Sequence, residues 1–197
     1  MVPIVAFIGW HNSGKTTLAV RVVKHLKEHG YLVAVIKSSK ETGITFDHVD
    51  TDTARYRRAG ADAVTFIAPD QMVMMTAAPV MSLVNLVQRF FSHVDIVIAE
   101  GFKDEPHIAK IEVTRAADDL LRDRVNGVIA LATDRTMNGD NVFRLEQSRE
   151  IANFIEKRFL ENSADRKEPA ARVFHQENKI KPPLCRLQKN KKILQSI

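Results

Sequence analysis

The sequence feature that most constrains the fold is a glycine-rich stretch near the start of the chain. Residues 9–17 read GWHNSGKTT and fit the phosphate-binding pattern G-x-x-x-x-G-K-[ST] at every fixed position. The apolar run before it, residues 4–8, predicts a strand buried on both faces. After it, apolar side chains recur at spacings of four until Gly30, which predicts a helix. This order of strand, loop and helix is the one in which the pattern binds phosphate.

The chemistry of this loop predicts a nucleotide site. Gly9 and Gly14 accept backbone angles that other residues avoid, so consecutive N–H groups can converge on a phosphate chain. The Lys15 ammonium can reach the β- and γ-phosphates, the Thr16 hydroxyl can hold Mg²⁺, and the start of the helix favours anions. The residues predicted to bind the phosphates are Gly9, His11, Asn12, Ser13, Gly14, Lys15, Thr16 and Thr17.

Further apolar runs predict an α/β fold of the phosphate-loop NTPase type, in which helices flank a mainly parallel sheet. The later predicted strands are residues 32–36, 95–99, 110–113 and 128–132, and the later predicted helices are residues 53–59, 79–93 and 147–160. In a parallel sheet the ligand lies beyond the carboxyl ends of the strands. Lys37 closes the second strand and is therefore predicted to overhang the nucleotide.

Glu100 is the first of two acids predicted to act at a metal ion. It ends an apolar run and is followed by Gly101. In phosphate-loop proteins such an acid reaches, directly or through water, the Mg²⁺ that the loop threonine holds. A glycine beside it often lets a backbone N–H approach the γ-phosphate. Strand-end acids are also common helix caps and salt-bridge partners, and this alternative stays open.

The second acid, Asp52, ends a polar stretch that is long for a connection. Residues 38–52 also contain Asp47, His48 and Asp50, which give the stretch a cluster of oxygen and imidazole groups. Loops of this length are commonly functional or mobile. Metal binding is one interpretation of the cluster, and a solvated acidic loop is the other.

A third acid, Asp134, is the candidate for recognition of the base. Thr133 and Asp134 follow the buried run 128–132. Guanine-specific proteins commonly place an aspartate at the end of a late strand, where its two oxygens accept from the guanine N1–H and N2–H₂ groups. The usual Asn-Lys-x-Asp sequence is missing, and Thr133-Asp134-Arg135 is a shortened match. The spacing favours guanine, and an Asx turn is the alternative.

Residues 63–76 predict a β-hairpin outside the strand–helix rhythm. Two apolar strands, residues 63–67 and 72–75, flank a turn that contains Pro69 and Asp70. The methionines and Phe66 make more apolar surface than a lone hairpin can cover. We predict that a second copy of the chain covers this surface in a two-fold dimer. The alternative is that the hairpin packs on the sheet of its own domain.

The net charge of +5 belongs to one end of the chain. Residues 164–197 hold nine basic and three acidic residues, whereas residues 1–163 hold 20 basic and 21 acidic ones. We therefore predict one domain, residues 1–163, with a basic and flexible tail, residues 164–197, and no nucleic-acid partner. No apolar run approaches the roughly 20 residues that span a bilayer. The single cysteine suits a reducing cytosol, so we expect a cytoplasmic protein without a membrane partner.

Taken together, these motifs resemble the MobB family of molybdopterin-guanine dinucleotide biosynthesis adaptor proteins. The resemblance covers about residues 3–160. It is carried by residues 9–17, by Ile36-Lys37, by Asp52 with the later Arg57-Arg58-Ala59-Gly60-Ala61, and by Ala99-Glu100-Gly101-Phe102-Lys103-Asp104-Glu105-Pro106 leading to Lys110-Ile111-Glu112-Val113. The phosphate loop is shared by very many proteins, and the Glu-Gly-Phe-Lys block is much more specific.

The resemblance implies a dimeric GTP-binding protein with weak GTPase activity. Such a protein would support the nucleotidyltransferase that joins GMP to molybdopterin, with GTP and Mg²⁺ as cofactors. It assigns Lys15, Asp52 and Glu100 to catalysis, Thr16, Asp52 and Glu100 to the metal, and Thr133 and Asp134 to the base. Two departures are visible. The stretch 38–52 has only His48 where a histidine-rich sequence is often seen, and the segment after residue 163 has no recognised counterpart.

The residues themselves leave one other function open. A small-molecule kinase would use the same loop to transfer the γ-phosphoryl group to an acceptor, which residues 38–52 and the methionine-rich region would hold. The family resemblance favours the accessory role over the kinase. Hydrolysis by the accessory protein is expected to be slow, because the sequence offers no candidate arginine finger and no glutamine at the usual water-positioning site.

Overall fold

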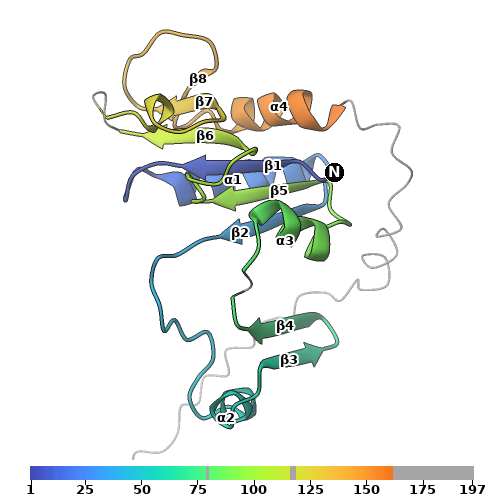
Figure 1. Ribbon diagram of the computed structural model, residues 1–197. Helices are drawn as coiled ribbons and strands as arrows, with labels where there is room; N and C mark the ends of the chain where they lie inside the picture. Colours follow the sequence, from blue (N-terminus) through green and yellow to red (C-terminus); the bar gives the residue numbers. More distant parts are fainter. Residues whose placement is uncertain (79, 116–118, 162–197) are drawn as a thin grey trace, which may run out of the picture. The chain divides into compact units, whose positions relative to one another are not determined.

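The computed structural model describes residues 1–78, 80–115 and 119–161, and its main body is a parallel β-sheet (Figure 1). The six strands run in the order β2-β5-β1-β6-β7-β8, and each neighbouring pair is parallel. Their bounds are β1 Ile4–Ile8, β2 Val33–Lys37, β5 Ile96–Glu100, β6 Ala109–Thr114, β7 Val128–Thr133 and β8 Val142–Arg144. The predicted α/β fold with a mainly parallel sheet is confirmed.

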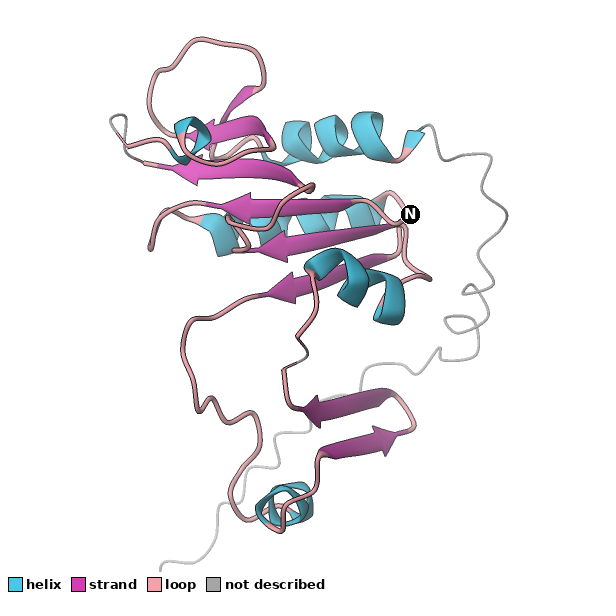
Figure 2. Cartoon of the chain, in the orientation of Figure 1, coloured by secondary structure: helices cyan, strands magenta, loops and turns pink. Residues whose placement is uncertain are grey.

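Helices lie on both faces of this sheet (Figure 2). On one face, Val5 and Phe7 of β1 pack in one core with side chains of α1 (Lys15–Glu28) and α4 (Ser148–Phe159). On the other face, Ile4, Ala6 and Ile8 pack with α3 (Leu83–Phe90) and with Leu121 of the 3-10 helix η1 (Leu121–Asp123). Successive side chains of a strand point to opposite faces, so a strand covered on both sides must be apolar throughout. This is why all five residues of β1 are buried.

The apolar stripe predicted for the first helix is the face that α1 buries. Leu18, Val22 and Leu26 are each at most 2% exposed, whereas Val20 between them is 62% exposed. Fully burying one such side chain contributes about 1.5–3 kcal/mol relative to leaving it in water. The packing of this stripe therefore fixes the start of α1, and with it Lys15 and Thr16, against the sheet.

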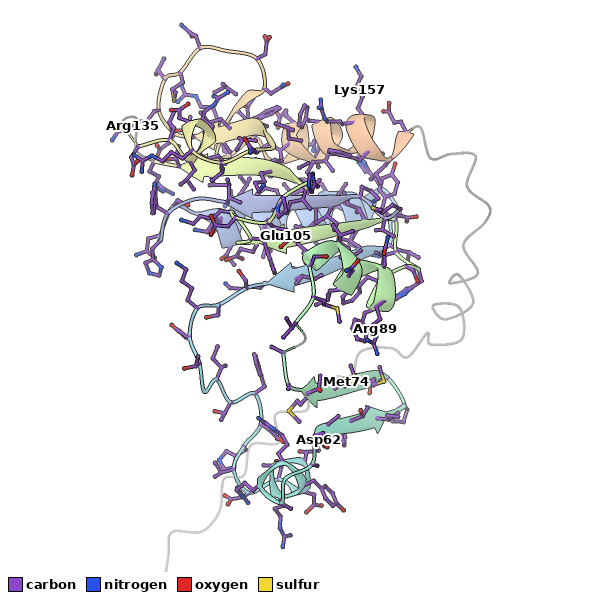
Figure 3. All side chains as sticks on the ribbon, in the orientation of Figure 1. Asp62, Met74, Arg89, Glu105, Arg135 and Lys157 are labelled. Carbon is purple, nitrogen blue, oxygen red and sulfur yellow. The ribbon has the colours of Figure 1, made fainter. Side chains whose placement is uncertain are left out.

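The hairpin forms a small sheet of its own. Strands β3 (Ala63–Ala68) and β4 (Gln71–Thr76) are antiparallel, with Thr65 opposite Met74. Met74 is labelled on β4 in Figure 3. The helix α2 (Asp52–Arg58) packs against β3. The two strands and their turn were predicted from the sequence and are confirmed. Large apolar side chains on them are exposed, namely Phe66, Ile67, Met72, Val73 and Met74.

Several boundaries differ from those expected. The helix predicted over residues 79–93 spans only Leu83–Phe90, because the Ser82 hydroxyl caps it by accepting from the Asn85 N–H. Pro79, the predicted first residue, lies outside the described residues, as do residues 164–197 of the predicted tail. The short strand β8 and the helix η1 were not predicted. Among the described residues, no helix has both the length and the apolar character needed to cross a membrane.

A polar cluster ties the end of α1 to α4. The Tyr31 hydroxyl donates to Oε1 of Glu156 over 2.6 Å, and Nδ1 of His29 lies 2.9 Å from Oε2 of the same carboxylate. Partial burial, followed by the bond to Glu156, raises the pKa of Tyr31 to about 12. The protonated phenol is therefore the form that stabilises the fold.

Tyr31→Phe should reduce the free energy of unfolding by about 1 kcal/mol at pH 8, because it removes this hydrogen bond. The folded-state pKa is above the unfolded value of about 10, so the contribution is present below pH 10 and is lost as the pH rises towards 12. Urea unfolding of both proteins at pH 8 and pH 11 measures this difference. A difference that stays constant between the two pH values would contradict the assignment.

Candidate functional site

The phosphate loop begins where β1 meets β6. Gly9 has a φ of 151°, and a Cβ atom at this position would lie 2.2 Å from the backbone oxygen of Val113. No larger residue fits there without displacing β6. At the other end of the loop, Gly14 has a φ of 97° and its carbonyl accepts the N–H of Leu18, so the chain turns directly into α1. These two glycines hold the loop between the sheet and the helix.

The remaining loop residues lie close to this backbone. Ser13 is buried, and Lys15 is the first residue of α1. The Lys15 ammonium donates to the Trp10 carbonyl over 2.6 Å and lies 3.5 Å from the Ser13 hydroxyl. Burial lowers the pKa of Lys15, Glu100 opposes this shift, and Lys37 adds to it. The exposed residues of the predicted set are His11, Asn12, Thr16 and Thr17.

Three predicted site residues meet at the carboxyl edge of the sheet. The Thr16 hydroxyl donates to Oε1 of Glu100 over 2.8 Å, and the Lys37 ammonium lies 3.0 Å from the same oxygen. Lys37 and Glu100 are opposite each other in the pairing of β2 with β5. The Glu100 side chain is only 13% exposed. This acid of β5 is enclosed by its contacts with Lys37 of β2 and Thr16 of α1. Its predicted position beside the loop threonine is thus observed.

The donor set at this edge fits Mg²⁺. A threonine hydroxyl and a carboxylate are hard oxygen ligands, and Mg²⁺ in nucleotide sites usually takes one or two protein oxygens together with phosphate oxygens and water. Across residues 1–78, 80–115 and 119–161, no three His, Cys, Asp or Glu side chains gather as a metal-binding group.

Asp52 is not brought to this edge by any contact within the described residues. It lies in the first turn of α2, where its 86% exposed carboxylate is 3.5 Å from Arg55. Its neighbours in the acidic stretch make local contacts. Asp47 accepts from Thr53, and His48 lies 3.6 Å from Asp50. This arrangement favours the solvated-loop interpretation of the stretch over metal binding.

Gly101 has a different use from the one expected. Its N–H donates to the Phe7 carbonyl over 3.1 Å, so it is engaged by β1 and does not point to a ligand. Its φ is 93°, and a Cβ atom would lie 2.3 Å from the Ser38 hydroxyl oxygen. The glycine is required because the chain turns tightly beside the end of β2.

Asp134 lies at the same edge and is paired with an arginine. Its Oδ2 accepts from Nη1 of Arg115 over 3.0 Å, and its backbone oxygen accepts from Arg144 over 2.8 Å. The turn after β7 is held by Thr133, whose hydroxyl oxygen accepts the N–H of Arg135 over 3.1 Å. In this turn the backbone N–H of Arg135 is thus bonded to the Thr133 hydroxyl, and the Asp134 carboxylate accepts from a side chain, Arg115. Arg115 follows β6 and had no local signal in the sequence.

A second connection to the phosphate loop was also missed. The indole N–H of Trp10 donates to the Asp119 carbonyl over 3.2 Å, and the Lys103 ammonium lies 5.1 Å from the centre of the Trp10 ring. The segment after Asp119 is fixed by Glu112 of β6, which is completely buried. The two Glu112 oxygens accept from the N–H groups of Leu121 and Arg122 over 2.7 and 2.8 Å. The loop is thus tied to β6 through η1.

A cavity of about 350 Å³ lies beside the Glu-Gly-Phe-Lys block, lined by residues 103–107, Lys110 and residues 124–126. Lys110 is 2% exposed, and its ammonium donates to the carbonyls of Glu105 and Asn126, each over 2.7 Å. Burial lowers the pKa of this lysine, and the charges of Asp104 and Glu105 partly offset that effect. No residue of the phosphate loop lines this cavity, so the two are separate features.

Comparison with known proteins identifies the family. The model of the family described as molybdopterin guanine dinucleotide synthesis protein B matches residues 4–134. The molybdopterin-guanine dinucleotide biosynthesis adapter protein of Escherichia coli (strain K12) is 32% identical over 149 residues, which are 71% of this chain and 83% of that protein. The adapter protein of the same name from Haemophilus influenzae is 32% identical over 163 residues, which are 79% of this chain and 88% of that protein.

A solved structure agrees with this result. The crystal structure of molybdopterin-guanine biosynthesis protein B (mobB) superimposes with a TM-score of 0.65 and 27% identity, over 78% of this chain and 98% of that one. The residues that the family model covers, 4–134, include β1, the phosphate loop and Glu100. This chain therefore belongs to the molybdopterin guanine dinucleotide synthesis protein B (MobB) family.

Proposed function

We propose that this protein binds GTP together with Mg²⁺ and serves as an accessory protein in the attachment of GMP to molybdopterin. The observation that carries the proposal is the contact of Thr16 and Lys37 with Glu100 beside the phosphate loop. The relatives named above are adapter proteins of molybdopterin-guanine dinucleotide biosynthesis, which supports a partner enzyme of that process. The partner would be the nucleotidyltransferase that uses GTP and molybdopterin, in the cytoplasm.

In this proposal, different residues bind the phosphates and the base of the nucleotide. The loop N–H groups and Lys15 bind the phosphates, and Thr16 and Glu100 hold the ion, which neutralises phosphate charge when bound. Asp134 accepts from guanine, and Thr133 keeps its turn in place. The family resemblance also assigns Asp52 to the metal or switch region, whereas in the structure its carboxylate lies 3.5 Å from Arg55 in the first turn of α2.

Hydrolysis is proposed to be slow. The Glu100 carboxylate accepts from the Thr16 hydroxyl and lies beside the Lys37 ammonium group. A carboxylate held in this way is better suited to binding the metal ion than to activating a water molecule as a general base. A slow GTPase keeps the triphosphate intact for a second enzyme. A small-molecule kinase would instead turn over at about 1–100 s⁻¹ with a phosphorylated acceptor as product.

Lys15→Ala should weaken GTP binding by about 10- to 100-fold, because it removes a charge-assisted hydrogen bond worth roughly 1.5–3 kcal/mol. Isothermal titration with GTP and Mg²⁺ measures this loss. Lys24→Ala is the matched control, since Lys24 is 74% exposed and its ammonium lies 3.9 Å from Glu28. In an assay that contains the nucleotidyltransferase, molybdopterin and GTP, the wild-type protein should raise the yield of the dinucleotide, and Lys15→Ala should not. Equal GTP affinity for wild type and Lys15→Ala would refute the nucleotide site.

We further propose that the protein is a homodimer through the hairpin. Ile67 is 73% exposed and Met72 is 65% exposed, and Phe66 and Met74 are each about half exposed. Side chains of this kind on a two-stranded sheet leave an apolar surface that a monomer has to present to water. A second hairpin related by a two-fold axis offers the same surface and buries both.

Met74→Lys should convert the dimer into folded monomers, because an ammonium group would be buried in the apolar interface. Light scattering at micromolar concentration measures the mass, and GTP binding should be retained because no predicted phosphate-binding residue lies on the hairpin. Val20→Lys is the control, since Val20 is 62% exposed on α1. A wild-type protein that is already monomeric would rule out the hairpin interface and leave the nucleotide site unaffected.

A further inference from the structure

Arg115 lies between the phosphate loop and the acid predicted to recognise the base. It directly follows β6, whose Val113 carbonyl is in close contact with Gly9. One guanidinium nitrogen, Nη2, lies 3.8 Å from the position that a Cβ atom on Gly14 would occupy. The other, Nη1, donates to Oδ2 of Asp134 over 3.0 Å. A single side chain therefore connects the two parts of the site.

The position of Arg115 is fixed from both sides. Its carbonyl accepts from Nε of Arg135 over 2.9 Å, which holds the main chain, and Asp134 holds the guanidinium. The Arg115 side chain is 60% exposed and that of Asp134 is 41% exposed, so the group is open to solvent and to a ligand. A planar guanidinium can donate to the carboxylate with one nitrogen and to a second acceptor with the other.

We propose that Arg115 is a phosphate-binding residue, which Asp134 positions over the glycine-rich loop. The proposal deepens the proposed function and rests on it, because the phosphates concerned are those of the nucleotide. Guanidinium groups bind phosphate oxygens with directed, charge-assisted hydrogen bonds, whereas the Lys15 ammonium acts as a point charge. Arg115 thus supplies the loop with a further cation, from the segment that directly follows β6. The site then recognises the phosphate chain from two directions.

The test is Arg115→Gln, which keeps the length and polarity of the side chain and removes its charge. GTP and inorganic tripolyphosphate, which has no base, are titrated separately with Mg²⁺. The chain has one tryptophan, Trp10, and it lies in the loop, so its fluorescence reports binding. We expect both ligands to lose about 10- to 100-fold in affinity, as for one charge-assisted hydrogen bond. Arg115→Lys should retain part of the affinity, because it keeps the charge and loses the fork.

Arg89→Gln is the matched control for the change in net charge. Arg89 lies in the last turn of α3 (Figure 3), and α3 leads into the start of β5, so Arg89 lies toward the amino end of the sheet and away from the loop. It should bind both ligands as the wild type does. Unchanged affinity of Arg115→Gln for tripolyphosphate would overturn the proposal, even if GTP binding fell, because Arg115 would then act only through Asp134 and the base. A wild-type protein that binds neither ligand would instead refute the proposed function itself.

Discussion

The site depends on the close contact between Gly9 and the backbone of β6. Because β1 and β6 are parallel neighbours with Ile8 opposite Glu112, the chain leaving β1 meets the Val113 carbonyl at once and has to turn over it. Only a residue without a side chain can make that turn. The turn leads into α1, whose buried stripe of Leu18 and Val22 anchors the helix to the sheet. Because Lys15 and Thr16 are the first residues of α1, this packing fixes the positions of the Lys15 ammonium and the Thr16 hydroxyl.

The elements that could be predicted from the sequence are those with a local signal. The buried strands appear as unbroken apolar runs, and the helix α1 appears as a stripe with a period of four, because burial acts on each residue directly. The strand β8 has three residues, none of them fully buried, and it pairs only with β7 at the edge of the sheet. The helix α3 begins where Ser82 caps it, and a cap is a weaker signal than a run of apolar residues.

The site was only partly predictable, because its contacts join strands that are distant in the sequence. Glu100 beside Thr16 followed from the rule that parallel strands end at one edge. The contacts of Arg115, Glu112 and Trp10 form because segments far apart in the sequence lie side by side in the fold. The spacing of residues along the chain does not reveal such neighbours. The position of Gly101 after a strand-end acid predicted a backbone N–H near the phosphates. In the structure this N–H donates to the Phe7 carbonyl, and the glycine is needed because a side chain would collide with Ser38.

The strand order also places Glu100 and Lys37 on strands that are held differently in the sheet. In the described sheet, β5 is hydrogen-bonded on both sides, whereas β2, which carries Lys37, is an edge strand bonded only to β5. An edge strand is held to its sheet by one row of backbone hydrogen bonds and a central strand by two. The Glu100 carboxylate therefore belongs to a strand that is paired on both sides, whereas its ammonium partner, Lys37, belongs to one of the two edge strands of the described sheet. The two groups that contact Glu100 are thus held differently: Thr16 by the buried face of α1, and Lys37 by a strand that is hydrogen-bonded on one side only.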